Sequence, residues 1–276
     1  MAPSSKAYLV LICVASTVVF LAGAFSCGNE RGWTARHEGY RASWGDEGCD
    51  GHTAWALCAG LISMLLALLM LIGEAVGSLQ GCKSKAAPFV AVFFFVWWMC
   101  AAGAITFAGP YTVVSNGYLG SWIAFFGSVL YGLEVSAAIQ KGVALLSGSM
   151  EKAGPPMAGL IIASIVELIA ASVYCSDCTD YRAYAVAVGT VSLALCFIVT
   201  ILPKCIESLS KFVPYVILLT FLWWLVAAIV LTFVSPFVWA GNGFFSTWVA
   251  VVSAALVYKN SDAPGAAQVT KASSAV

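Results

Sequence analysis

The stretch Pro88–Tyr131, PFVAVFFFVWWMCAAGAITFAGPYTVVSNGYLGSWIAFFGSVLY, is written twice in this chain. Moved forward by 126 residues, it aligns without a gap on Pro214–Val257, PYVILLTFLWWLVAAIVLTFVSPFVWAGNGFFSTWVAVVSAALV, with 15 identities in 44 positions. Alanine and valine matches mean little in so apolar a chain. The rarer matched residues are Trp97/Trp223, Trp98/Trp224, Pro88/Pro214, Pro110/Pro236, Asn116/Asn242, Gly117/Gly243 and Trp122/Trp248. This self-similarity predicts a duplicated structural unit.

Two further sets of matched residues extend the repeat toward the start of each half. At an offset of 148, the matched pairs are Ala15/Ala163, Ser16/Ser164, Ala22/Ala170 and Cys27/Cys175. At an offset of 129, they are Cys49/Cys178, Trp55/Tyr184, Gly60/Gly189 and Ser63/Ser192. The two offsets differ because the segment between the first two cysteines is 19 residues longer than its counterpart.

The composition is that of an integral membrane protein. Hydrophobic residues make up 61% of the chain and charged residues only 9%, with a mean hydropathy of +0.93, whereas soluble domains carry roughly 25% charged residues. The net charge of zero gives no electrostatic reason to expect nucleic acid as a partner. We expect the lipid bilayer to be the main surroundings of this protein.

Eight apolar stretches approach the roughly 20 residues that a helix needs to cross a bilayer. They are Ala7–Phe25, Ala54–Ile72, Pro88–Ala108, Tyr118–Ile139, Met157–Tyr174, Ala183–Leu202, Pro214–Val234 and Gly243–Tyr258. The predicted fold class is therefore an all-α polytopic membrane protein with eight transmembrane helices, arranged as two parallel four-helix repeats. The predicted segments are a first repeat over 1–140, a cytoplasmic linker over 141–156, a second repeat over 157–259 and a disordered cytoplasmic tail over 260–276.

The first helix also resembles a cleavable signal peptide, because Lys6 precedes an apolar run that contains Ala22-Gly23-Ala24. Its counterpart in the second half is internal, so we expect it to be retained. Nine lysines lie on one side of the eight-span arrangement and four arginines on the other. The excess of basic residues predicts that both termini are cytoplasmic, in the plasma membrane or in an endomembrane or vesicle.

Cys27 and Cys49 bracket the only long external loop, and Cys175 and Cys178 bracket its shorter counterpart. Because the exoplasmic side is oxidising, we expect these four cysteines to form structural disulfides. Two alternatives remain for the sequence. Cys49-Asp50-Gly51-His52 could bind a metal together with His37, and the Cys175-Ser176-Asp177-Cys178 spacing could serve redox chemistry.

Small residues recur at every fourth position on the last helix of each half, a pattern typical of tightly packed membrane helices. In the first half they are Gly120, Ala124, Ser128 and Gly132, and in the second Ser246, Ala250 and Ala254. The pattern does not say whether these residues join helices within one chain or between copies.

Two features in helix interiors have both a functional and a structural interpretation. Trp97-Trp98 could form a platform for a ligand or a sterol, or simply fill the space between helices. Glu167 is the one ionisable side chain predicted at bilayer depth, where such residues are functional candidates. It could be a proton-relay or cation site, or a protonated carboxyl bonded to a Ser, Thr or Tyr of another helix.

The familiar phosphate-binding loop, nucleophile elbow and His-Glu-x-x-His motifs are absent from the sequence. We therefore expect no enzymatic activity and no cofactor or catalytic metal. Four spans with cytoplasmic ends, a cysteine-bounded first external loop and Asn-Gly-aromatic turns resemble the tetraspan families of MARVEL and physin type, and more weakly the claudins. The claudin Gly-Leu-Trp signature is lacking, since Ala42-Ser43 precedes Trp44.

The resemblance implies a protein that organises membrane domains or vesicles by association with itself or with other membrane proteins. The alternative is a transporter or channel with a midplane site between the repeats that involves Glu167, since repeats often flank such a site.

Overall fold

The computed structural model describes residues 5–28, 49–76, 80–173, 175, 178–201 and 205–261, and these residues form helices and turns without any strand. The chain divides into two compact units, Met1–Ala144 (unit 1) and Leu145–Val276 (unit 2). The described residues of each unit form a bundle of four helices. The predicted all-α class is confirmed.

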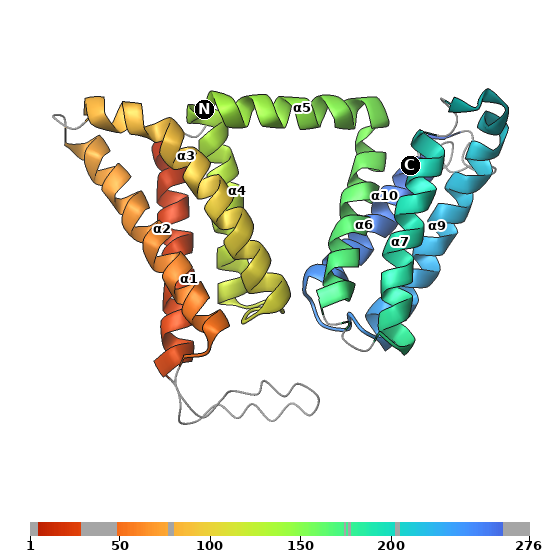
Figure 1. Cartoon of the computed structure of the whole chain (residues 1–276), viewed down its shortest axis with the longest axis horizontal. Coiled ribbons are helices and arrows are strands. Elements are labelled where there is room, and N and C mark those ends of the chain that lie inside the picture. Colours follow the sequence, from red (N-terminus) through yellow and green to blue (C-terminus); the bar gives the residue numbers. More distant parts are fainter. Residues whose placement is uncertain are drawn as a thin grey trace, which may run out of the picture. The chain divides into compact units, whose positions relative to one another are not determined.

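Unit 1 is built from α1 (Ser5–Gly28), α2 (Gly51–Ala75), α3 (Gln80–Gly103) and α4 (Asn116–Val135). Helix α1 packs against α2 and α4, and α3 closes the bundle by packing against the same two helices (Figure 1). Its core is apolar, with Leu9, Ile12 and Phe94 fully buried.

Unit 2 has the same arrangement of α6 (Pro155–Val173), α7 (Asp180–Thr200), α9 (Val213–Ile229) and α10 (Asn242–Lys259). Helix α6 packs against α7 and α10, and α9 packs against those two helices. A short 3₁₀ helix, η3 (Glu207–Phe212), leads into α9, and Pro214 stands in the first turn of α9, where its missing N–H leaves no bond unmade.

Helices α3 and α9 both end in a widened π-helical turn, η2 (Ala104–Ala108) and η4 (Val230–Val234). The backbone N–H of Gly109 donates to Ala104 O at 3.2 Å, and that of Ser235 donates to Val230 O at 3.1 Å. The Gly109-Pro110 and Ser235-Pro236 peptide bonds that follow are both cis. The sequence predicts a helix end at these prolines but not the wider turn before them.

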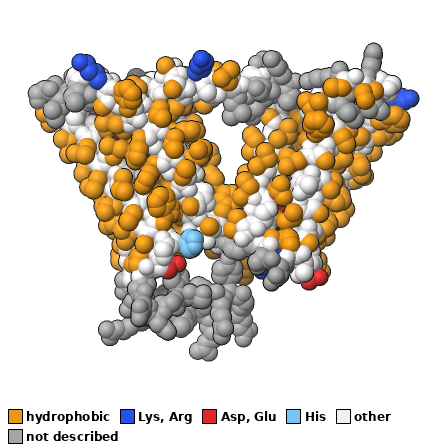
Figure 2. Space-filling model, viewed as in Figure 1, with side chains coloured by type: hydrophobic (Ala, Val, Ile, Leu, Met, Phe, Trp, Pro, Cys, Tyr) orange, Lys and Arg blue, Asp and Glu red, His pale blue; other side chains and the backbone are white. Residues whose placement is uncertain are grey.

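Among the residues that the structure describes, seven helices are long and apolar enough to cross a membrane by length and composition: α1, α2, α3 with η2, α4, α6, α7 and α9 with η4. Helix α10 has 18 residues and is not among them, because Asn242, Ser246, Thr247 and Lys259 lower its hydropathy. Hydrophobic side chains cover the visible flanks of both units (Figure 2). The protein is thus a polytopic membrane protein whose outer surface suits contact with lipid.

The segment predicted as a linker between the halves is largely helical. Helix α5 (Ala137–Ala153) occupies most of it and ends at Gly154, whose positive φ of 83° suits glycine. Pro155 then begins α6. Glycine and proline punctuation located the end of this segment, but it concealed the helix before that end.

Both predicted disulfides are present, Cys27–Cys49 and Cys175–Cys178. Cys49 is therefore not available to bind a metal, and Asp50 instead caps α2, accepting from the backbone N–H of Thr53 at 2.9 Å. His37 and Trp44, between Cys27 and Cys49, lie outside the described residues, as does the predicted tail from residue 262 onward.

Candidate functional site

A chain of hydrogen bonds crosses the interior of unit 1. The indole Nε1–H of Trp98 on α3 donates to Ser63 Oγ on α2 at 2.8 Å. Ser63 Oγ lies 2.8 Å from Ser16 Oγ on α1, and Ser16 donates to Ile12 O one turn earlier at 2.6 Å. Trp98, Ser63 and Ser16 are all fully buried. Three of the four helices are therefore joined by polar contacts inside an apolar bundle.

The direction of every proton in this chain follows from the chemistry of its members. An indole can only donate, and each serine hydroxyl has one proton. Since the Ser16 proton is used on Ile12 O, the proton between the two serines must come from Ser63. Each donor is thus used once, as buried polar groups require.

Unit 2 contains the same chain at the offsets of the sequence alignment. Trp224 Nε1–H donates to Ser192 Oγ at 2.8 Å, Ser192 Oγ lies 2.8 Å from Ser164 Oγ, and Ser164 donates to Leu160 O at 2.7 Å. Trp224, Ser192 and Ser164 are also fully buried. The sequence comparison paired these residues, but it did not show that they bond to one another.

The second tryptophan of each pair repeats as well. Trp97 Nε1–H donates to Ala59 O at 3.2 Å, and Trp223 Nε1–H donates to Val188 O at 3.3 Å. Both indoles are half-buried against the helix that holds the bonded serine. These contacts favour the interpretation that the Trp-Trp pairs fill the space between helices over that of a ligand platform.

The stripes of small residues face the inside of their own units. Gly120 lies against Val19 and Ala15 of α1, so that an added methyl group would meet Val19 Cγ2 at 3.0 Å, and Gly132 lies against Ile139 at the start of α5. The other stripe residues are buried too: Ala124, Ser128, Ser246, Ala250 and Ala254. The sequence left open whether these small residues join helices within one chain or between copies. At these positions the contacts lie within a single unit of one chain.

The turns that follow η2 and η4 are closed by an aromatic ring lying on a glycine, Tyr111 on Gly117 and Phe237 on Gly243. A side chain at either glycine would overlap the ring, which explains why glycine follows asparagine here. Burial raises the pKa of the Tyr111 phenol above its ordinary value, and the nearby Asp50 carboxylate adds to this effect.

The residues that flank these turns differ in burial between the units, unlike the contact between ring and glycine. Asn116 is exposed whereas Asn242 is buried. Trp122 is half-buried and packs against Phe125 and Phe126, with ring centroids 5.9 and 6.0 Å away. Its counterpart Trp248 is 39% exposed. Pro110 and Pro236 are both half-buried.

Glu167 is the one Asp, Glu, Lys or Arg that is fully buried among the described residues. It lies on α6 against α7, and its Oε2 occupies the space where a side chain at Gly189 would begin. Neither carboxyl oxygen has a hydrogen-bond partner. The interhelical bond that one interpretation expected is therefore not formed.

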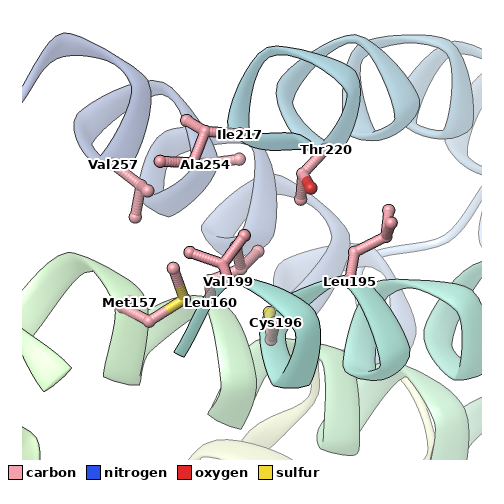
Figure 3. Close-up of a pocket in the computed structure, with 9 residues that line it drawn as sticks. All are labelled: Met157, Leu160, Leu195, Cys196, Val199, Ile217, Thr220, Ala254 and Val257. Atoms are coloured by element: carbon pink, nitrogen blue, oxygen red, sulfur yellow. The ribbon is translucent and has the colours of Figure 1, made fainter. Parts of the chain in front are cut away.

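Unit 2 has a small apolar cavity of about 10 Å³ between its four helices, near the first turns of α6 and α9 (Figure 3). It is lined by Met157, Leu160, Leu195, Cys196, Val199, Ile217, Thr220, Ala254 and Val257. At an offset of 126, Thr220 and Val257 correspond to Phe94 and Tyr131, two fully buried rings in edge contact at 6.4 Å between centroids. The cavity thus marks the place where unit 2 lacks an aromatic pair.

Within the described ranges, His, Cys, Asp and Glu nowhere gather in a group of three or more that could hold a metal ion. No family model, curated protein or solved structure matches this chain.

Proposed function

We propose that the protein organises membrane domains or vesicles without enzymatic activity, through rigid helical units that associate laterally in the bilayer. The observation that carries this proposal is the way each unit is filled. Trp98, Ser63 and Ser16, and their counterparts in unit 2, use their protons on one another, and apolar side chains fill most of the remaining interior. What each unit offers to other molecules is its large apolar outer surface.

The proposed topology has eight spans in two tandem copies, with α10 as the eighth. Helix α10 matches α4 in sequence, in its packing against the first helix of its unit and in the ring-on-glycine turn before it. Four spans per copy would place both disulfides on the exoplasmic side and the lysine-rich ends in the cytoplasm. The likeness to the MARVEL and physin tetraspan plan is part of this proposal.

The test is to reconstitute the full chain, with one fluorophore per chain, into vesicles at several protein-to-lipid ratios and to count photobleaching steps per cluster. We expect clusters larger than one chain at ratios where random placement gives single chains. Single chains at every ratio would contradict the proposal.

Two neighbouring residues of α4 provide a matched pair of controls for this test. Ala124 is fully buried in its unit, whereas Phe126 is 58% exposed. Ala124→Ile should therefore disturb the unit itself, as circular dichroism and thermal unfolding would show. Phe126→Ala should leave the unit folded, so that any loss of clustering reports on the outer surface.

A transporter or channel is the second candidate, and the unpartnered carboxyl of Glu167 favours it. The same vesicles provide its test, which is to load them with a pH-sensitive dye and compare proton flux between the unmodified chain and Glu167→Gln. Flux that is lost in the variant would establish transport and replace the first proposal.

A further inference from the structure

Glu167 is a buried acid that the packing of its unit does not require. Its counterpart at an offset of 148 is Val19, which is also fully buried and whose Cγ2 lies against Gly120 of α4. A valine of comparable size thus occupies the equivalent buried position of unit 1. A carboxyl group without a partner in an apolar interior costs free energy, so another property of the acid must account for its presence in unit 2.

The contact between α6 and α7 is arranged differently from its counterpart in unit 1. At Gly60 the backbone of α1 comes closest, and an added methyl group would meet Phe20 N at 2.5 Å and Ser16 O at 2.8 Å. At Gly189 the first atom met is Glu167 Oε2, ahead of Leu168 Cβ at 2.9 Å and Ser164 O at 3.1 Å. The carboxyl group therefore stands directly in the seam between the two helices.

Within the part of the chain that the structure describes, no group donates a hydrogen bond to this carboxyl. The protons of Ser192 and Ser164 are used within the hydrogen-bond chain one turn away. On α7, Tyr184 is half-buried five residues before Gly189, and Cys196 lies seven residues after Gly189, about 10 Å along the helix axis. Asp180, Tyr181 and Arg182 stand at the start of α7.

The other helix packed against α6 brings no nearby charge either. Tyr258 and Lys259 of α10 belong to its last turn. That last turn lies near the first turns of α6, because Gly159 packs against Ser253. Glu167 is twelve residues after Pro155, or about 18 Å along the helix axis. A deprotonated Glu167 would thus be an unpaired charge in a dry seam, and the packed seam fits only the neutral acid.

We propose that Glu167 is a reversible proton-binding site, and that loss of its proton opens the α6–α7 seam to water. Unit 2 would then respond to a rise in pH, whereas unit 1, with Val19, would not. The inference deepens the site of the second candidate function, but it requires no net transport. It also stands apart from lateral association, since clustering and protonation are measured separately.

The first measurement is infrared spectroscopy of the full chain in lipid nanodiscs, which detects the carbonyl band of a neutral carboxylic acid. Exposed carboxyls are ionised at neutral pH because their ordinary pKa values are about 4. We expect one such band at pH 7 that is lost in Glu167→Gln and in Glu167→Val. A spectrum unchanged by both substitutions would overturn the proposal.

The second measurement uses dicyclohexylcarbodiimide, an apolar reagent that reacts with neutral carboxyl groups. The carboxyl oxygen adds to the central carbon of the reagent and the carboxyl proton passes to a reagent nitrogen. The acyl group then shifts to nitrogen and leaves a stable N-acylurea, without oxidation or reduction. We expect mass spectrometry to find the adduct on Glu167 at pH 7 and less of it as the pH is raised. If infrared spectroscopy shows Glu167 ionised at pH 7 and mass spectrometry finds no adduct on it, the inference is wrong.

The third measurement tests the opening of the seam by amide hydrogen exchange at several pH values. Exchange is base-catalysed everywhere, so α1 and α2 of the same molecule provide the internal reference. We expect α6 and α7 to gain additional exchange at high pH in the unmodified chain and to lose this gain in Glu167→Val. This variant should fold because unit 1 holds a fully buried valine, Val19, at the equivalent position. Equal pH profiles in the unmodified chain and the variant would exclude the switch.

Discussion

Units 1 and 2 share their buried polar contacts but differ in the apolar packing around them. The chain from tryptophan through two serines to a helix carbonyl has nearly equal distances in both. The surrounding positions have changed, since Phe94 corresponds to Thr220 and Val19 to Glu167. The same hydrogen bonds thus accompany the same arrangement of helices, while the side chains that fill the space around them can vary.

The largest difference between the units should come from truncating the aromatic pair. Phe94→Ala removes a fully buried ring and should lower the free energy of unfolding by about 3–5 kcal/mol. Thr220→Ala at the matching place beside the cavity should have a much smaller effect. Unfolding in SDS, followed by tryptophan fluorescence, measures both variants. Equal losses would mean that the two cores are equally filled.

Removing the disulfides should give the second-largest difference in stability between the two units. Cys27 and Cys49 are 22 residues apart in sequence, and Cys175 and Cys178 are three apart. On loop entropy alone, replacing both cysteines of a pair by alanine should cost about 3 kcal/mol in unit 1 and about 1.5 kcal/mol in unit 2. The same SDS titration measures the two losses, and a larger loss in unit 2 would show that its short bridge has a role beyond chain entropy.

Exchanging the residues at the acid site should give effects of opposite sign. Glu167→Val removes an unsatisfied buried carboxyl and should stabilise unit 2 by about 1–3 kcal/mol, while Val19→Glu should destabilise unit 1 by a similar amount. Hydrogen exchange resolved by helix can assign each change to its unit. Destabilisation by Glu167→Val would show that the acid has a partner after all.

The smallest expected loss of stability should also be nearly equal in the two units. Trp98→Phe and Trp224→Phe each remove one interhelical hydrogen bond, which within membranes contributes about 0.6 kcal/mol and at most about 1.7 kcal/mol. Because the two chains of hydrogen bonds have the same geometry, the two losses should agree. A clear difference in the SDS titration would show that the polar contacts are not equivalent in energy.

Rare residues made much of the fold predictable. Tryptophan, proline and the Asn-Gly pair define one gapless alignment, and the cysteines extend it, so the alignment alone pairs Ser16 and Ser63 with their counterparts and predicts both disulfides. The residue types also indicate burial, since a serine inside an apolar helix needs a partner. The actual bonds were not predictable, because they depend on which helices are neighbours and how each is rotated.

Other features were beyond the reach of sequence patterns. Helix α5 was hidden because its two glycines, Gly142 and Gly148, and the Gly154-Pro155-Pro156 that follows it are typical of a linker. The cavity beside Thr220 could not be predicted, because the sequence does not show that the matching residue of unit 1, Phe94, is buried in the core. The environment of Glu167 was equally hidden, since nothing in sequence says that Gly189 makes room for its carboxyl group.

The serine–tryptophan chain has a mechanical consequence for each unit. It ties α1, α2 and α3 together at one depth, and α6, α7 and α9 in the same way. The remaining helices, α4 and α10, meet α1 and α6 through small side chains such as Gly120, Gly127 and Ser253. Each unit therefore has three helices joined by polar bonds at one depth, and a last helix that meets the first through closely packed small side chains.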